Sequence, residues 1–432
     1  MIQAKKYLFA FVAFVATCGP LGAQPRVFTL DELLSVADTC SAPLRASRLA
    51  ADASRAEQEA VDRRVLTPDV RLDAAVGYLG NGYGWGRDSS YSFTVPIPHF
   101  STRFGVEAQQ VVFSGGAARA ARQQAAQGAR LASLDAAQRR QEVRLHLVGL
   151  YLDLFRLQCQ ASVLDSNVAR TRRLVDDIRA LHESGVALKN DLTRNELRLS
   201  ELLQQRASVA DELRVVGRQA ATLAGLGPTA VVLPDSSFLH ALPQPTLYVD
   251  SLALSLQVAQ AQVALAEARL RQSRASLWPS LAVVAQDRLE GPVTIDITPY
   301  DINYNYWFVG LSLNYNLSAL WKSRSGMRAE RLRLEESRLR RQYAADVHRS
   351  ERDAASIRLA EAERRCATRR QSVALARENY ELVYRRYLSD VARLIDLLDA
   401  ADVRLRAELD LVSARADVAY QHYVLQYVAG RL

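Results

Sequence analysis

The stretch DVRLDAAVGY, residues 69–78, alternates between apolar residues and charged or small residues. Its apolar positions are Val70, Leu72, Ala74, Val76 and Tyr78, and its charged positions are Asp69, Arg71 and Asp73. A period of two predicts a β-strand with two different faces. About ten residues is also the length with which a tilted strand crosses a bilayer. We expect lipid on one face and water on the other, although a soluble sheet packed on helices is an alternative.

Three further stretches continue this pattern. RFGVEAQQVVF (residues 103–113) and WFVGLSLNYNL (residues 307–317) alternate clearly, and LAVVAQDRL (residues 281–289) alternates more weakly. We predict strands over about 69–79, 103–113, 281–289 and 306–317, arranged as two hairpins. Four strands cannot close a membrane barrel, because the smallest barrels have about eight and open edges are not tolerated in lipid. If the hairpins enter a membrane, several copies of the chain must share one barrel.

Most of the remaining sequence has apolar residues at helical spacing. Helices are predicted from Thr29 to about Arg64, Gly116 to about His182, Lys189 to Ala224, Thr246 to Leu277, Ser325 to Tyr387, and Ala392 to the end. At ~1.5 Å per residue, the second of these would be ~100 Å long. Such a length is typical of coiled-coil or rod-like packing.

The N-terminus predicts export. Residues 1–23 have a basic start, MIQAKK, an apolar run, YLFAFVAFVAT, and the small residues LGA, which together indicate a signal peptide. Cys18, in VATC, offers the rival interpretation of a lipidated cysteine. No later run reaches the ~18 apolar residues of a transmembrane helix.

Composition argues against nucleic-acid binding and against a metal site built from cysteines. The chain has 55 Lys and Arg against 47 Asp and Glu, and the acidic residues are mixed among the arginines, so no basic stripe is present. Cys40, Cys159 and Cys366 are too far apart for a CxxC metal site and are interpreted as small buried hydrophobic residues.

The order helix, strand, strand, long helix, turn, helix occurs twice along the sequence. Residues 24–245 form the first predicted repeat and residues 246–432 the second. Pro68 and Pro279 each stand at a helix-to-strand junction. The two repeats have drifted apart by insertion and deletion, because the spacing between equivalent positions is not constant.

The far turns of the two repeats also correspond. HESGVALKNDLTRNEL (residues 182–197) matches YLSDVARLIDLLDA (residues 387–400). The alignment pairs Gly185 with Asp390, Asp191 with Asp396, and Arg194 with Asp399. The two turns are therefore equivalent in position but different in charge.

Six segments are distributed over nearly the whole chain after the signal peptide. They are FTLDELLSVA (28–37), TPDVRLDAAVGY (67–78), QQVVFSGGAARAARQQA (109–125), SGVALKNDLTRNELRLSE (184–201), ASLWPSLAVV (275–284) and the stretch beginning YLSDVARLIDLLDA (387–400). In this order and duplication, they resemble the TolC family of outer-membrane efflux proteins. The resemblance implies a mostly α-helical fold with a membrane β-barrel contribution. It implies a homotrimer whose twelve-stranded barrel is continued by an α-helical tunnel across the periplasm.

The resemblance also implies a function. The chain would be an exit duct in the outer membrane, extending into the periplasm, for small molecules such as drugs or metals, or for proteins. A periplasmic adaptor and an inner-membrane transporter would complete the machine, and the duct would catalyse no reaction and need no cofactor. The alternative is a periplasmic coiled-coil adaptor or scaffold without a barrel.

Asp396 and Asp399 are the candidate functional pair, because residues three apart lie on one face of a helix. From the residues alone, they are an acid–base pair, ligands of a hard cation or part of a solvated face. The resemblance implies that they form carboxylate rings at a pore constriction at the periplasmic tip. It further implies a place for Tyr387 in the closing network and for Arg393 in an interhelix salt bridge. The expected adaptor-docking turns are Gly185, Val186 and Ala187 in the first repeat, and Asp390, Val391 and Ala392 in the second.

Overall fold

The computed structural model describes residues 26–88, 90–185, 187–227, 230, 232–235, 253–293, 300–389 and 391–432. The predicted signal peptide, residues 1–23 with Cys18, lies outside the described residues, and so does the predicted boundary between the repeats at residue 245.

The chain divides into two compact units, and each unit takes segments from both halves of the sequence. Unit 1 consists of Met1–Leu49, Leu134–Gln257 and Ala344–Leu432, and unit 2 consists of Ala50–Ser133 and Val258–Tyr343. The predicted repeats therefore contribute jointly to each unit.

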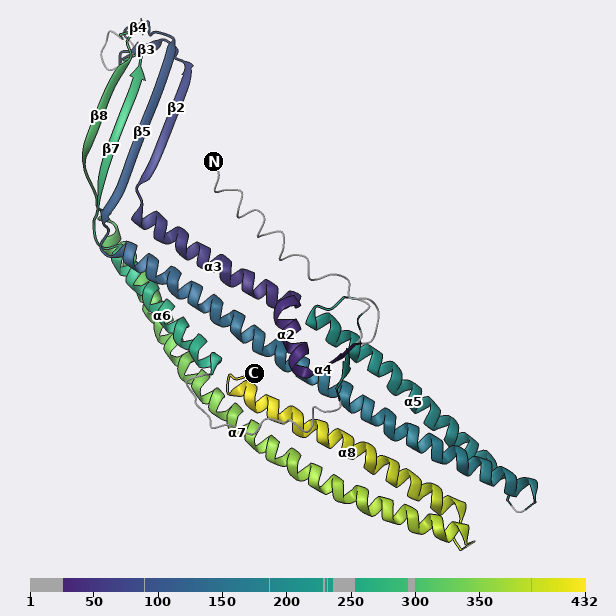
Figure 1. Cartoon of the computed structure of the whole chain (residues 1–432). Helices are drawn as coiled ribbons and strands as arrows, with labels where there is room; N and C mark the ends of the chain where they lie inside the picture. The colour runs from purple at the N-terminus through teal and green to yellow at the C-terminus, as the bar shows by residue number, and fades with distance from the viewer. Residues whose placement is uncertain are drawn as a thin grey trace, which may run out of the picture. The chain divides into compact units, whose positions relative to one another are not determined.

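A four-stranded antiparallel sheet forms the β part of unit 2 (Figure 1). Its strands are β2 (Asp69–Tyr78), β5 (Phe100–Phe113), β7 (Ser280–Gly291) and β8 (Tyr304–Asn314). The order is β2-β5-β7-β8, so the hairpin of each half is joined to the other through β5 and β7. The outer strands β2 and β8 each have a neighbour on one side within this sheet.

The register of the sheet separates an apolar face from a polar face. Leu72 lies opposite Val106, and Leu311 lies opposite Val283, so these side chains share one face. On the other face, Arg71 lies opposite Glu107, which is 3.9 Å from Arg288. Leu72 is 78% exposed and Leu311 is 68% exposed. The apolar face is therefore open in the single chain, which argues against the soluble sheet packed on helices.

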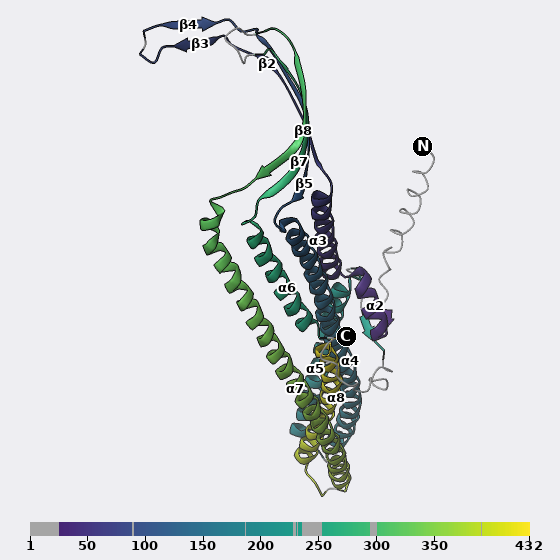
Figure 2. The same cartoon turned by 90° about the vertical axis from the view of Figure 1, so that its left-hand side faces the viewer.

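Two details of the β region differ from the sequence expectation. The loop after β2 contains a small hairpin, β3 (Gly82–Trp85) and β4 (Ser92–Val95), which lies beyond the ends of the long strands (Figure 2). Strand β8 ends at Asn314 rather than at residue 317. It stops there because a turn begins, in which the Ala319 amide donates to the Asn316 carbonyl at 3.0 Å.

The helices are α2 (Leu30–Cys40), α3 (Ala42–Leu66), α4 (Ala117–Glu183), α5 (Lys189–Ala224), α6 (Leu254–Ala275), α7 (Ala319–Leu388) and α8 (Leu394–Val428). Helices α4 and α7 have 67 and 70 residues, so each is ~100 Å long. The expectation of a single helix from Thr29 to Arg64 is wrong. Ser41 separates α2 from α3 with an extended ψ of 122°, and its carbonyl accepts the first hydrogen bond of α3 from Arg45.

Gly115 explains the glycine pair between β5 and α4. Its φ is +59°, in the left-handed region that disfavours residues with a Cβ. A Cβ at this position would come within 2.2 Å of the Cβ of Trp278. The SGG segment is therefore a strand-to-helix junction packed against the start of β7.

The core of unit 1 is built by α2, α4, α5 and α8 together with a short parallel pair, β1 (Arg26–Phe28) and β6 (Val232–Pro234). Tyr151 of α4 is fully buried in this core. Its hydroxyl donates to the Phe28 carbonyl at 3.0 Å and accepts from the Asp235 amide at 2.9 Å, which joins both short strands to α4.

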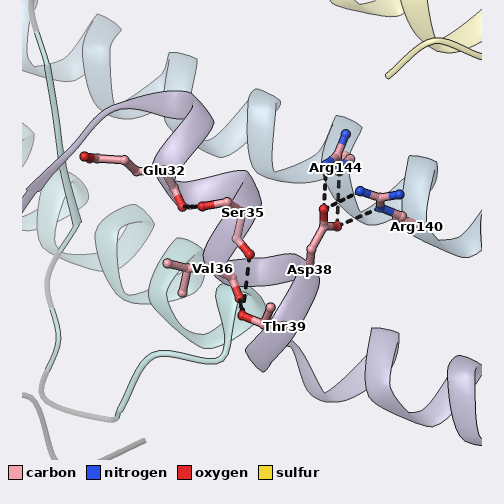
Figure 3. A network of polar contacts seen from close by, with 7 residues as sticks. All are labelled: Glu32, Ser35, Val36, Asp38, Thr39, Arg140 and Arg144. Carbon is pink, nitrogen blue, oxygen red and sulfur yellow. Dashed lines mark hydrogen bonds and ion pairs between the residues drawn. The ribbon is translucent and has the colours of Figure 1, made fainter. Parts of the chain in front are cut away.

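A carboxylate clamp holds α2 on α4 (Figure 3). Asp38 accepts hydrogen bonds from Arg140, at 2.9 and 2.5 Å, and from Arg144, at 3.3 and 2.5 Å. Burial raises the pKa of Asp38, but the hydrogen bonds from Arg140 and Arg144 outweigh burial and hold this pKa below its ordinary value.

Candidate functional site

Two helical hairpins of unit 1 carry all the predicted site residues that the structure describes. Helix α4 ends at Glu183 and α5 begins at Lys189, while α7 ends at Leu388 and α8 begins at Leu394. Figure 1 shows the two turns at the same end of these four helices. Val186 and Asp390, which belong to the predicted docking turns, lie outside the described residues.

The backbones of the two turns are closed by equivalent hydrogen bonds. The amide of Ala187 donates to the carbonyl of Leu181 at 3.1 Å, and the amide of Ala392 donates to the carbonyl of Arg386 at 3.3 Å. Leu388 and Leu394 lie 205 positions after Glu183 and Lys189, the same offset that separates these donors and acceptors. The turn alignment made from the sequence thus has a counterpart in backbone geometry.

Gly185 gives the first turn its shape. Its φ is +79°, which glycine adopts without steric cost. His182 is the second-last residue of α4. One of its ring nitrogens lies 2.9 Å from the carbonyl oxygen of Ala187, and this contact ties the turn to the end of the helix.

Asp396 has a structural role that the sequence interpretation did not include. Its carboxylate accepts a hydrogen bond of 3.1 Å from the amide of Arg393, the residue that precedes α8. A carboxylate in the first turn satisfies an amide that the helix leaves unpaired and also interacts favourably with the helix dipole. Asp191 occupies the same position in α5, three residues after Leu188. Asp191 makes no capping hydrogen bond to a residue that the structure describes, so the favourable interaction with the helix dipole is the reason for an acidic residue that both positions share.

Asp399 lies one turn further along α8 and is exposed, as is Asp396. The row continues to Asp402, which the sequence interpretation missed although the spacing of three repeats. Asp402 accepts from Arg198 of α5. Burial raises the pKa of Asp402 above its ordinary value, and the charge of Asp399 adds to this effect, while Arg198 acts in the opposite direction.

The remaining predicted residues lie around the second turn. Tyr387 is half-buried in the last turn of α7, and Val391 and Ala392 follow it in the turn. Arg393 has an exposed side chain directly before α8. The structure thus brings Tyr387, Arg393 and Asp396 into one turn region.

The chemistry of these groups is electrostatic. In the described part of the chain, no cluster of three or more His, Cys, Asp or Glu residues has the arrangement of a metal site. Among the described helices, none combines the length and apolar character that crossing a membrane requires. The exposed carboxylates are suited to attract cations through their field.

Comparison with family models gives a match in the second half of the chain. Residues 251–431 match the family model of the outer membrane efflux protein. The match spans less than half of the chain, so it shows that the second half is similar to this family. This match agrees with the resemblance predicted from the sequence and with the predicted localisation in the outer membrane. No curated protein matches the sequence significantly.

Solved structures of outer-membrane proteins and channels share the fold along almost the whole chain. The outer membrane protein VceC from Vibrio cholerae is 14% identical over 93% of this chain and 96% of its own, with a TM-score of 0.76. The Campylobacter jejuni CmeC outer membrane channel is 12% identical over 93% and 85%, with a TM-score of 0.75. The Neisseria gonorrhoeae MtrE outer membrane channel is 16% identical over 93% and 88%, with a TM-score of 0.74. These similarities confirm the predicted mostly helical fold with its β contribution.

Proposed function

We propose that this chain is an outer membrane efflux protein that serves as the exit duct of an efflux or secretion machine, and that three copies close one twelve-stranded barrel. The four-stranded sheet carries the proposal. It combines an exposed apolar face with a polar face, and its outer strands β2 and β8 are available for pairing. Because open edges are not tolerated in lipid, such a sheet needs the edges of further copies.

Disulfide formation between β2 of one copy and β8 of the next tests the closed barrel. Ala75→Cys in β2 is combined in turn with Phe308→Cys, Gly310→Cys or Ser312→Cys in β8, all on the polar face. The background has Cys40, Cys159 and Cys366 replaced by alanine. We expect at least one combination to give a covalent ladder that ends at three copies in outer-membrane extracts.

Each single-cysteine variant serves as the control for this experiment. A ladder that continues beyond three copies contradicts a closed trimer. Failure of every combination in correctly localised protein contradicts pairing between β2 and β8.

The proposed machine includes a periplasmic adaptor and an inner-membrane pump, with the helices extending into the periplasm as a tunnel. We assign adaptor docking to the two turns, residues 185–187 and 390–392. Their equivalent backbone hydrogen bonds and common end of unit 1 support this assignment. Substrates pass through the duct, so the chain itself catalyses no step.

We further propose that Asp396 and Asp399 line the constriction at the tip, with Tyr387 and Arg393 beside them. Their exposed carboxylates support this role, because three copies of each form an acidic ring and acidic rings favour cations. Asparagine is the informative replacement, since it removes the charge at Asp396 while leaving an oxygen that accepts from the Arg393 amide.

The double variant Asp396→Asn with Asp399→Asn should show reduced cation preference and weaker block by divalent cations in planar bilayers. Asp191→Asn is the matched control, because Asp191 has the same helix position in the other hairpin. Unchanged selectivity in the double variant, or an equal effect of the control, would mean that the second hairpin does not supply the constriction.

The alternative of a periplasmic coiled-coil adaptor receives less support. A soluble adaptor has no need for an open apolar face on a sheet of four long strands, in which Leu72, Leu311 and Leu313 are each more than two-thirds exposed. A water-soluble monomer after removal of the signal segment would favour this alternative over the duct.

A further inference from the structure

A small cavity lies inside unit 1 where helices α4, α5, α7 and α8 meet. Its volume is about 30 Å³, and its lining includes Arg170, Arg198, Tyr380 and Arg404. On α4, Arg170 is 15 residues before Gly185, which places this part of the lining roughly 22 Å from the first hairpin turn. On α8, the lining includes Leu397 and Leu398, which stand between Asp396 and Asp399, so the cavity adjoins the proposed constriction residues.

Arg170 brings an unsatisfied donor to this cavity. Its Nη2 atom is buried and makes no hydrogen bond to any residue that the structure describes. The nearest carboxylate oxygen, Oε2 of Glu408, is 4.0 Å away, which is beyond hydrogen-bond distance. A buried guanidinium nitrogen without an acceptor is costly, and the cost is larger for a charged group than for a neutral one.

Glu408 cannot neutralise Arg170 alone, because two other arginines already use it. Arg377 donates to Oε1 of Glu408 at 2.9 Å, and Nε of Arg404 lies 3.4 Å from the same oxygen. Glu408 is buried, and its single negative charge is shared by three guanidinium groups. The cluster therefore retains positive charge.

The other carboxylates near the cavity are also committed. Asp402 pairs with Arg198. Glu381 lies 3.5 Å from Nη1 of Arg404, but its side chain is 58% exposed and its charge is screened by water. Arg377 is equally exposed, at 58%, so its charge is screened as well. Three less exposed arginines, Arg170, Arg198 and Arg404, thus meet two carboxylates, the buried Glu408 and the part-buried Asp402.

The uncharged lining groups are also able to donate. Tyr380 lies under the guanidinium of Arg404, with 4.9 Å between Cζ and the ring centre. Burial raises the pKa of Tyr380, so its hydroxyl keeps its proton at neutral pH. Burial and the nearby Arg404 lower the pKa of Arg170, against the opposing effect of Glu408, in agreement with an excess of positive charge.

We propose that this cavity is a binding site for a small inorganic anion, chloride, held by Arg170 and Arg404. The volume exceeds the ~10–15 Å³ that one water molecule needs and is far too small for an efflux substrate. Because Arg170 belongs to α4 and Arg404 to α8, the bound anion joins the two helical hairpins. The anion therefore adds an electrostatic link between the two hairpins at a position where arginines outnumber carboxylates.

Thermal unfolding of the full protein in detergent tests the site. At equal ionic strength, chloride or bromide should raise the Tm by roughly 2–4 °C relative to gluconate, which is too large for the cavity. Arg170→Gln should abolish this difference. Arg173→Gln, which changes an exposed arginine of the same helix, should retain it.

Bromide-soaked crystals give the direct readout, since the anomalous signal of bromide should lie beside Nη2 of Arg170. An equal Tm in chloride and gluconate overturns the proposal. So does a halide effect that survives in Arg170→Gln, or a cavity that holds only water in the bromide crystals. None of these outcomes bears on the duct, which is tested separately by the disulfide ladder.

Discussion

At the scale of single residues, unit 1 depends on carboxylates that are shared between arginines. Asp38 accepts from two guanidinium groups, and its side chain is 12% exposed (Figure 3). Charged hydrogen bonds of this kind contribute more than neutral ones when they are screened from water. Asp38 lies in α2 and its partners lie in α4, so the clamp fixes the N-terminal helix on the bundle.

Replacing Asp38 with asparagine should destabilise the protein by about 1–3 kcal/mol, because Arg140 and Arg144 lose their shared charged acceptor. The pKa of Asp38 is lower in the folded protein than its unfolded value of about 3.9. The stabilisation is therefore present above about pH 4 and is lost as the pH falls through the folded pKa. Thermal unfolding measured at several pH values checks both expectations.

Asp135→Asn is the control for this variant, because Asp135 is an exposed residue of α4. It should leave the Tm nearly unchanged at every pH. If Asp38→Asn behaved in the same way as Asp135→Asn, the clamp would contribute nothing to stability.

The sequence predicted features within one helical turn better than contacts between segments that are distant in the sequence. The spacing of Asp396 and Asp399 is visible locally, and their neighbour Asp402 could have been found by the same spacing. The partners of Asp38 lie more than a hundred positions away, and periodicity carries no information about which distant arginines face it.

At the scale of elements, the sheet of unit 2 has faces that the sequence predicted correctly, because alternation along a strand is a local property. Its short hairpin β3–β4 was missed. Each of these strands has four residues, and Gly82 and Gly84 interrupt the β3 pattern, so the periodic signal was too short to detect. The break at Ser41 was also missed, although Pro43 in the first turn of α3 is a usual sign of a helix start.

The two faces of β8 predict opposite responses to the same substitution. Leu311→Arg places a charge on the apolar face and should cost about 2–4 kcal/mol near the middle of a bilayer. Ser312→Arg changes the adjacent residue, which lies on the polar face, and should be tolerated. The measured quantity is the amount of heat-modifiable oligomer extracted from the outer membrane.

The comparison is internally controlled, since both variants add the same charge to neighbouring positions. We expect the oligomer to be lost for Leu311→Arg and retained for Ser312→Arg. Similar yields for both variants would contradict the assignment of the apolar face to lipid.

At the scale of the whole molecule, the duplication was visible in the sequence. The way in which the two halves combine in three dimensions was not. In each half, a helix (α3 or α6) precedes two strands of the four-stranded sheet, and two further helices follow them. The halves do not fold as two separate domains, because β5 of the first pairs with β7 of the second. Helix and strand periods predict elements and their order, whereas the pairing of strands from different halves depends on contacts between residues distant in the sequence.

The two outer strands of the sheet have a genetic consequence if three copies close the barrel. Every copy must supply both β2 and β8, so one defective chain would leave a gap in the whole ring. When equal amounts of intact chain and a chain with a damaged edge strand mix freely, only about one trimer in eight consists of intact chains alone. Edge-strand mutations that still permit association should therefore be dominant over the normal gene.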